Sequence, residues 1–392
     1  MAEPLAQSYH VIAVSPDPSQ VWAGTPALAR LPSGRLVACY EWFRRGVDAE
    51  RIPNQTEILV SDDRGKTWRR TTEIDIIWPS LFTYGHELYA IGSRRKSREA
   101  VITRSSDGGQ TFTPEQTLFE GRFHNSATHV LIKDSWAYRA YEACEAGAGR
   151  SQWRSLVVAG DLSRDLLDRD SWRMSPQLEF PGVPDLLQQH FYEPSVEDKI
   201  PETCWLEGNV IAVRGDIRVV LRTTIDAHST AGLAAICRLE DDGTELRYRF
   251  VQFHPMPGAQ CKFSILYDEP SGLFWTTVTR PTDPWQDRGP LKARGFFGAP
   301  GNERRILMLM YSLDALNWFD AGCVAMSPHP LDSFSYASQI VDADDLLVLA
   351  RTSQGGLNQH DTNLITLHRV RRFRDLALKI HADLSWRQKP PS

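Results

Sequence analysis

The chain has 392 residues, of which 42% are hydrophobic and 24% are charged, the proportions of a water-soluble globular protein. Its formal net charge of −5 comes from interspersed acidic and basic residues without a basic stripe, which argues against a nucleic-acid partner. No apolar run approaches the length of a membrane span, so we expect no membrane partner either.

Short apolar runs separated by turn residues begin near the N-terminus. Val11–Val14 predicts a first strand, and the runs 26–31 and 36–40, separated by a Pro-Ser-Gly turn, predict a hairpin. Single strands are predicted at 57–61, 100–104, 306–312 and 363–370. Strand pairs are predicted at 78–82 with 88–91, 126–132 with 136–142, 210–213 with 219–223, 234–239 with 248–253, 263–267 with 274–279, and 337–341 with 346–351.

Helical periodicity is scarce. Only residues 161–168 and 374–384 could form helical turns, whereas turn residues recur about every 8–12 residues. This pattern predicts an all-β protein. Composition does not change along the chain, so we expect a single domain over residues 1–392 with a short C-terminal tail at about 373–392. The six cysteines lack metal-ligand spacing and are expected to be buried as small hydrophobic side chains.

Two octapeptides, residues 61–68 and 105–112, share the pattern Ser-x-Asp-x-Gly-x-Thr-aromatic. The Asp carboxylate can accept hydrogen bonds from nearby backbone N–H groups, and the Gly permits the positive φ of a tight turn. We therefore expect Asp63 and Asp107 to bind turn backbone, and Trp68 and Phe112 to be largely buried. A shortened copy at 312–318 predicts the same for Asp314 and Trp318, and a degenerate candidate lies at 165–172.

The octapeptide resembles the Asp-box of sialidases and other β-propeller proteins. The two full copies start 44 residues apart, about the length of one four-stranded propeller blade. The resemblance implies an all-β, six-bladed β-propeller with Asp-box turns. In such a fold the termini usually share a blade, so the Val11–Val14 strand is expected to pair with residues 363–370.

Sialidases are retaining glycosidases that use Tyr as the nucleophile, and the resemblance implies candidates for each role. A Tyr is a weak nucleophile at neutral pH, so a neighbouring carboxylate must take its proton. Tyr336, in Ser335-Tyr336-Ala337-Ser338, resembles the nucleophile segment. Glu207 and Arg222 resemble the Glu that activates the Tyr and an Arg that binds the substrate carboxylate. Asp48 is the candidate acid/base, with Glu50 as the alternative.

The resemblance implies that further arginines bind the substrate carboxylate together with Arg222, and this set is incomplete in the sequence. Arg304 or Arg305 could supply one member. The sialidase signature aromatic-Arg-Ile-Pro should precede the first blade strand, but the equivalent stretch 21–26 contains Pro26 and no Arg. We therefore expect little hydrolysis of simple α-sialosides.

Several further polar residues stand at predicted strand ends, where a propeller would bring them to its central face. Together they suit a glycan substrate, because sugars require many directional hydrogen bonds. A single histidine is more often a structural residue, but several strand pairs here offer a polar group at the same end. The set comprises His124, Tyr192, Glu193, His228, Lys262, Arg280 and His360.

Three functions follow from these residues. The first is an exo-acting, retaining, sialidase-like glycoside hydrolase acting on a glycan with an acidic or deoxy sugar. The second is a polysaccharide lyase, in which His124 with Tyr192 or Tyr336 removes the proton α to a uronate carboxyl. The third is a glycan-binding propeller without catalysis. No cofactor motif or metal-ligand spacing is present, so none is expected.

The N-terminus, residues 1–7, lacks the basic and apolar regions of a signal peptide. This favours a cytoplasmic protein. A secreted or periplasmic location would follow if a signal had been removed. The sequence does not define the oligomeric state.

Overall fold

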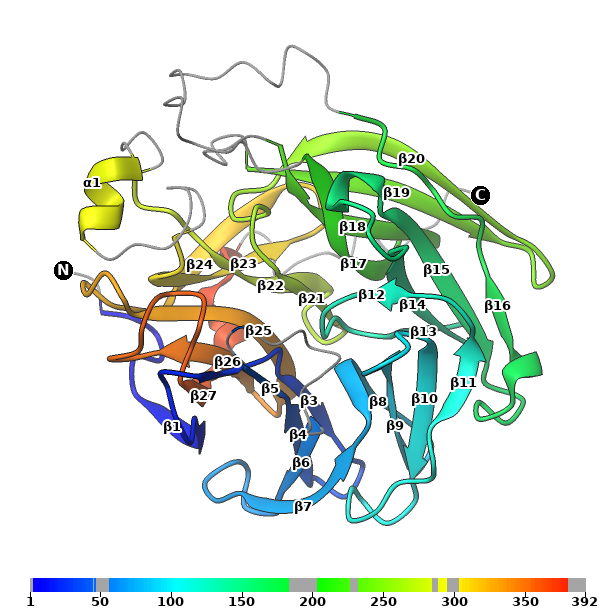
Figure 1. Cartoon of the computed structure of the whole chain (residues 1–392), viewed down its shortest axis with the longest axis horizontal. Coiled ribbons are helices and arrows are strands. Elements are labelled where there is room, and N and C mark those ends of the chain that lie inside the picture. The colour runs from blue at the N-terminus through cyan, green and yellow to red at the C-terminus, as the bar shows by residue number, and fades with distance from the viewer. Residues whose placement is uncertain are drawn as a thin grey trace.

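The computed structural model describes residues 3–44, 46, 56–182, 203–225, 232–283, 288–294 and 303–379. Six antiparallel sheets are arranged around a central axis (Figure 1). The fold is an all-β, six-bladed β-propeller, as the sequence predicted.

The blades follow one another in chain order. Blade 1 contains β3 (Ala27–Arg30), β4 (Leu36–Tyr40), β6 (Thr56–Ser61) and β7 (Arg69–Ile74). Blade 2 contains β8 (Ile76–Tyr84), β9 (Glu87–Arg94), β10 (Ala100–Ser105) and β11 (Gln116–Phe119). Blade 3 contains β14 (Trp136–Ala143), β15 (Arg154–Asp161) and β16 (Trp172–Met174), with the short β12 (Phe123–His124) and β13 (Leu131–Lys133) both paired to β14. Blade 4 contains β17 (Cys204–Val213), β18 (Asp216–Thr224), β19 (Leu233–Asp241) and β20 (Leu246–Pro255).

Blade 5 contains β21 (Ser264–Asp268), β22 (Leu273–Thr279), β23 (Ile306–Ser312) and β24 (Trp318–Met326). Blade 6 combines β25 (Ser333–Asp342), β26 (Asp345–Ser353) and β27 (Leu364–Val370) with the N-terminal strand β1 (Tyr9–Val14). The expected pairing of the first strand with the last is therefore confirmed, and it closes the ring between the two ends of the chain. In the six sheets, β3, β8, β12, β17, β21 and β25 lie nearest the axis (Figure 1). A separate two-stranded ribbon joins β2 (Val21–Ala23) to β5 (Trp42–Arg44).

Among the described residues, helical structure is limited to short segments. The α-helix α1 (Arg288–Ala293) was not expected from the sequence. Residues 161–168 form turns, and 3₁₀ segments occur at Arg150–Gln152, Arg169–Ser171 and Phe373–Leu376. No helix in the described part of the chain is long and apolar enough to cross a membrane.

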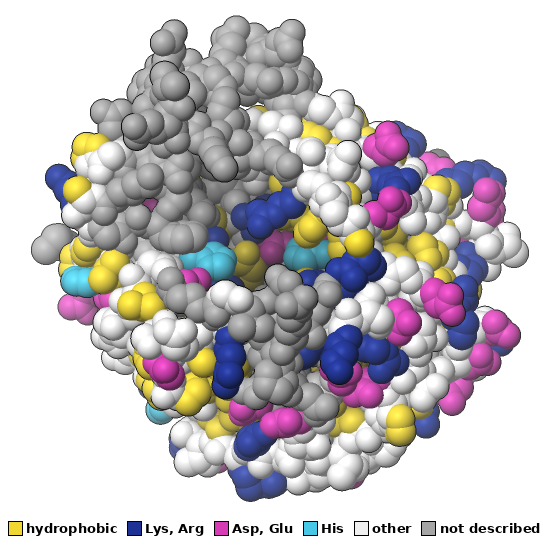
Figure 2. Space-filling model, in the orientation of Figure 1, with side chains coloured by type: hydrophobic (Ala, Val, Ile, Leu, Met, Phe, Trp, Pro, Cys, Tyr) yellow, Lys and Arg dark blue, Asp and Glu magenta, His cyan; other side chains and the backbone are white. Residues whose placement is uncertain are grey.

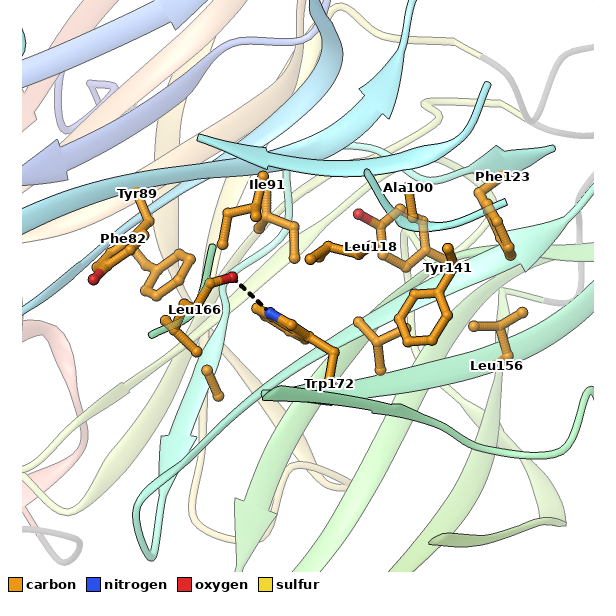
Figure 3. Packing of buried hydrophobic residues seen from close by; sticks show 14 of the residues in the cluster. Phe82, Tyr89, Ile91, Ala100, Leu118, Phe123, Tyr141, Leu156, Leu166 and Trp172 are labelled. Carbon is orange, nitrogen blue, oxygen red and sulfur yellow. Dashed lines mark hydrogen bonds between the residues drawn. The ribbon is translucent and has the colours of Figure 1, made fainter. Parts of the chain in front are cut away.

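Apolar side chains fill the wedges between neighbouring blades. Between blades 2 and 3, Trp172 lies among Phe82, Ile91 and Leu118, and its indole N–H donates to the carbonyl of Leu166 at 2.8 Å (Figure 3). Because the indole N–H has a hydrogen-bond partner, the ring is buried without leaving a donor unpaired. All six cysteines are free thiols, and five of them are buried while Cys323 is half-buried.

The three Asp-containing turns have the expected hydrogen bonds. Asp107 Oδ1 accepts from the backbone N–H groups of Gln110 and Thr111 at 2.9 and 3.0 Å, and Asp63 and Asp314 make equivalent bonds. The aromatic residue that follows each turn was expected to be largely buried, in a different blade for each copy. Trp68, Phe112 and Trp318 are half-buried, and each packs against a different apolar cluster.

Candidate active site

A cavity of about 220 Å³ opens at the centre of the propeller. Histidine and basic side chains gather at the centre of this face (Figure 2). The described lining comes from blades 2, 3, 4 and 6, from the β2–β5 ribbon and from the segment between β2 and β3: Trp22, Thr25, Phe43, Trp78, His124, Asn125, Ser126, Glu207, Tyr336, Arg351 and His360.

Three of these residues share an unusual backbone conformation. Trp78, Glu207 and Tyr336 have φ of 54°, 57° and 51°, in the left-handed region that non-glycine residues seldom adopt. Each lies at a β-bulge in the first strand of its blade, in β8, β17 and β25 respectively. A bulge rotates a side chain away from the normal alternation of a strand. In blades 2, 4 and 6, a bulge with a positive-φ residue thus places one side chain in the cavity.

The Glu207 carboxylate and the Tyr336 hydroxyl are joined by a single nitrogen atom. Arg222 Nη1 donates to Glu207 Oε2 at 2.9 Å and to Tyr336 Oη at 3.2 Å. Burial raises the pKa of Glu207, but the charge and hydrogen bond of Arg222, with a further contribution from Lys262, hold that pKa below its ordinary value. Glu207 is therefore an ionised carboxylate at neutral pH. No direct hydrogen bond joins Glu207 to Tyr336 in the described structure, contrary to the geometry the sequence led us to expect.

Two further guanidinium groups lie against the Tyr336 ring. The guanidinium carbons of Arg351 and Arg304 are 4.8 and 5.3 Å from the ring centre. Both arginines are buried. With Arg222, which donates to the Tyr336 hydroxyl, three guanidinium groups contact this one side chain. Such a set stabilises negative charge on its phenol oxygen or on a bound carboxylate.

A side chain at Gly24, in the stretch where the sialidase signature has its Arg, would clash with neighbouring residues. A β-carbon at Gly24 would lie 2.4 Å from Cγ of Glu41 and 2.7 Å from the Phe43 ring. Glu41 is fully buried, and burial raises its pKa to about 7 despite the nearby Arg95 and Arg351. Its Oε1 accepts from the Thr25 N–H at 3.2 Å. A buried Glu thus fills the space beside the position where the signature places an Arg.

His124 is held by a buried carboxylate on the opposite side of the cavity. Its Nδ1 lies 2.8 Å from Glu142 Oε2, and Glu142 Oε1 accepts from the backbone N–H of Glu207 at 2.8 Å. The His124 ring is flanked by Trp78 and Trp153, with centroid distances of 4.5 and 5.0 Å. These contacts fix the orientation of the imidazole.

Comparison with solved structures identifies the fold. A Trypanosoma rangeli sialidase in complex with sialic acid matches with a TM-score of 0.62 at 12% identity, over 96% of this chain and 61% of that one. A Hadza microbial sialidase matches with a TM-score of 0.57 at 13% identity, over 93% of this chain and 68% of that one. The GH93 α-L-arabinofuranosidase of Fusarium graminearum in complex with arabinobiose matches with a TM-score of 0.54 at 12% identity, over 94% and 98% of the two chains. The chain has the sialidase-like β-propeller fold.

This sialidase-like propeller is divergent in sequence. No protein-family model matches it, and no curated protein matches it. It spans 61% of the length of the Trypanosoma sialidase chain. The likeness therefore establishes the architecture, and the chemistry has to be argued from the residues in the cavity.

The propeller brings together six of the site residues expected from the sequence. Tyr336, Glu207, His124 and His360 line the cavity, and Arg222 and Arg304 contact Tyr336. Lys262 is buried beside them, where its Nζ donates to the carbonyl of Ala337 at 2.6 Å and burial lowers its pKa to about 7.

Two of the expected residues contribute to other contacts. The Arg305 guanidinium binds Glu303 at 2.5 Å and the Pro328 carbonyl at 3.0 Å. Arg280 forms an ion pair with Asp320 at 2.6 Å. Neither lines the central cavity in the described structure. Asp48, Tyr192, Glu193 and His228 lie outside the described residues.

Sequence reasoning missed four residues of the site. Arg351 was considered only as the end of a strand, Trp78 only as the start of one, and Glu142 only as the end of a partner strand. Glu41 was not considered at all. One signal was available for Trp78, because a residue before Pro79 is restricted in backbone conformation. The other three became visible only when the blades were assembled.

Proposed function

We propose that this sialidase-like propeller is an exo-acting, retaining glycoside hydrolase whose nucleophile is Tyr336. The observation that carries the proposal is the shared hydrogen bonding of Tyr336 Oη and Glu207 Oε2 to Arg222 Nη1. A weakly acidic hydroxyl beside an ionised carboxylate has the base it needs to act as a nucleophile. The likeness of fold to a sialidase and to an arabinofuranosidase supports the reaction class.

The substrate end that enters the cavity is a single terminal sugar carrying an anionic group. Arg222, Arg304 and Arg351 offer planar guanidinium groups that bind carboxylates in a bidentate manner. The cavity of about 220 Å³ is smaller than the roughly 300–1,000 Å³ of typical ligand sites, which favours a chain end over a chain interior. Trp22 and Phe43, whose rings are stacked 6.0 Å apart, offer apolar faces to the sugar ring.

The reaction proceeds in two displacements. Tyr336 Oη attacks the anomeric carbon while its proton passes to Glu207, a transfer that requires the two groups to come within hydrogen-bond distance when substrate binds. The glycosidic oxygen leaves after protonation by an acid. Water then attacks the same carbon, and the Tyr336 oxygen leaves and regains its proton. Two inversions give overall retention of configuration.

A panel of fluorogenic glycosides of uronic, sialic and neutral sugars tests this proposal. We expect turnover of an acidic sugar with retention, measured by NMR of the first product anomer. The Tyr336→Phe variant should be inactive with an unchanged melting temperature, and a fluorinated substrate analogue should label Tyr336 in peptide mass spectrometry. An inverted product, or an active Tyr336→Phe variant, would refute the nucleophile.

A uronate lyase is the second candidate, because His124 and Tyr336 line the same cavity. In that reaction one of them removes the proton α to the carboxyl group and the arginines stabilise the enolate-like charge. The product would be an unsaturated sugar that absorbs in the ultraviolet. The appearance of that absorbance in place of a plain reducing end would favour the lyase over the hydrolase.

A further inference from the structure

The pair of Glu142 and His124 has no role in the nucleophilic half of the proposed reaction, although it lies in the same cavity. The Glu142 side chain is 0% exposed and the His124 side chain is 15% exposed, so the pair runs from the interior to the cavity wall. His124 and Glu142 face each other in the β12–β14 register. A buried carboxylate on Nδ1 leaves Nε2 as the ring nitrogen available to a ligand.

The two oxygens of Glu142 have different partners. Oε1 accepts from the backbone N–H of Glu207, which requires a lone pair, and Oε2 lies 2.8 Å from His124 Nδ1. A protonated carboxyl group fits both contacts, with Oε1 as its carbonyl oxygen and Oε2–H as the donor to Nδ1. This arrangement places the remaining imidazole proton on Nε2, facing the cavity.

The electrostatics of the surroundings favour this neutral form. Burial raises the pKa of Glu142, and the neighbouring Glu207 carboxylate raises it further. Burial lowers the pKa of His124, and nearby guanidinium groups add to this effect against the opposing pull of Glu207. The charged groups that act on the pair come from five elements or turns: Arg98, Arg139, Arg150, Glu207 and Arg222.

We propose that His124 is the acid/base of the reaction and that Glu142 supplies its proton through Nδ1. This inference rests on the proposed glycosidase function and assigns the step that the sequence had given to Asp48. As the bond between the anomeric carbon and the glycosidic oxygen breaks, Nε2–H protonates the leaving oxygen and the Glu142 Oε2 proton moves to Nδ1. Glu142 becomes a carboxylate and His124 stays neutral.

The second displacement reverses the transfer. Water attacks the anomeric carbon, Nε2 takes one proton from that water, and the Nδ1 proton returns to Glu142. Every proton is accounted for, and His124 is never an imidazolium ion. This differs from a catalytic Asp that stays ionised and only orients its His, because here the carboxyl group is itself protonated at the start.

Leaving-group dependence tests the acid role in the full chain. The sugar that the wild type hydrolyses is presented as a 2,4-dinitrophenyl glycoside, whose leaving group needs no acid, and as a phenyl glycoside, which does. We expect His124→Ala and Glu142→Gln to lose about 10²–10⁴-fold in kcat/KM on the phenyl substrate and little on the dinitrophenyl substrate. The second displacement still needs a base, so His124→Ala should have a low kcat on the dinitrophenyl glycoside, and sodium azide should raise that kcat and yield a glycosyl azide, because azide needs no base.

His360 provides a matched comparison, since it also lines the cavity and has a carboxylate, Asp361, 2.8 Å from Nδ1. His360→Gln should lower kcat/KM by the same factor on both substrates, as expected for a binding residue. Equal losses on both substrates for His124→Ala would overturn the acid role while leaving the glycosidase intact. A loss confined to the phenyl substrate in His360→Gln would show that His360, and not His124, is the acid.

A second measurement needs no substrate and separates this inference from the proposed function. Nitrogen-15 NMR of histidine-labelled protein should show His124 protonated on Nε2, with a change to the Nδ1–H tautomer in wild type as rising pH ionises Glu142. Glu142→Gln should keep the Nε2–H tautomer at every pH. An imidazolium at His124 between pH 5 and 8, or a tautomer change in Glu142→Gln, would overturn the relay even if the enzyme proved to be a lyase.

Discussion

Glu207 and Tyr336 occupy equivalent positions in two blades, since each is the positive-φ residue of a bulge in the first strand of its blade. Trp78 is the third member of the set, in blade 2. Backbone strain of this kind costs of order 1–3 kcal/mol per residue and is retained where the surrounding structure enforces it. Its recurrence at three side chains of one cavity indicates that Trp78 belongs to the binding machinery.

Trp78→Ala should therefore lower kcat/KM at least about tenfold, which corresponds to about 1.4 kcal/mol of lost transition-state binding. Trp136→Ala is the matched control. Both tryptophans are half-buried and each has an Arg guanidinium over its ring, Arg98 at 4.3 Å and Arg173 at 3.9 Å, but Trp136 does not line the central cavity in the described structure. Steady-state kinetics should leave Trp136→Ala near wild type. Equal losses in the two variants would show that Trp78 acts only through stability.

Arg222→Met should destabilise the fold by about 3–5 kcal/mol, because it leaves the buried Glu207 carboxylate without its ion-pair partner. Arg222→Met combined with Glu207→Gln should be less destabilised than the sum of the two single variants, by about 0.5–3 kcal/mol. Urea denaturation of the four proteins measures this coupling. Additive losses would show that the two side chains do not stabilise one another. The double variant should remain inactive, since both groups act on Tyr336.

Asp107→Ala should cost about 1–2 kcal/mol of stability and leave activity unchanged. The carboxylate accepts two backbone N–H bonds and the Thr111 hydroxyl, and those donors lose their partner in the variant. Hydrogen bonds to the ionised form outweigh burial and lower the Asp107 pKa to about 2. Asp107→Asn, which keeps an acceptor oxygen, should lose less. Denaturant midpoints measure the loss of stability, and steady-state kinetics on the same variants measure activity. A loss of activity in a variant that remains folded would contradict the prediction that this turn has no part in the active site.

The architecture was predictable from the sequence because it depends on local chemistry that repeats. The Ser-x-Asp turns and the short strands are each encoded within a few residues, whereas the closure of β1 on β27 was expected from the resemblance to propellers, in which the two ends of the chain share a blade. The pair Glu207 and Arg222 was also accessible, since the two lie on adjacent strands. The contacts of Arg351 with Tyr336 and of Glu142 with the Glu207 backbone were not, because both depend on bulges that shift the register. A bulge changes which face a residue occupies, and the sequence pattern alone does not reveal it.

The closure between the two ends of the chain should be sensitive to acid through His368. This histidine of β27 is fully buried, with Nδ1 2.8 Å from the carbonyl of Ala6 and Nε2 3.0 Å from the Thr366 hydroxyl. Burial lowers its pKa to about 4, although the Ala6 carbonyl opposes the shift. The unfolded chain, with an ordinary His pKa of about 6.5, therefore binds more protons between these two pH values, and stability falls as pH falls.

Between pH 7 and pH 4.5 this single group should remove about 2 kcal/mol from the free energy of unfolding. His129 and His360 shift in the same direction and Glu41 in the opposite one, so the absolute pH slope is not decisive. The difference between wild type and His368→Asn isolates His368 and should shrink by that amount as pH is lowered. His10→Asn, at an exposed position of β1, should follow the wild-type curve. Urea titrations at the two pH values measure both differences. A wild-type minus His368→Asn difference that stays constant with pH would mean that His368 has the same pKa in the folded and unfolded states, and would contradict the prediction.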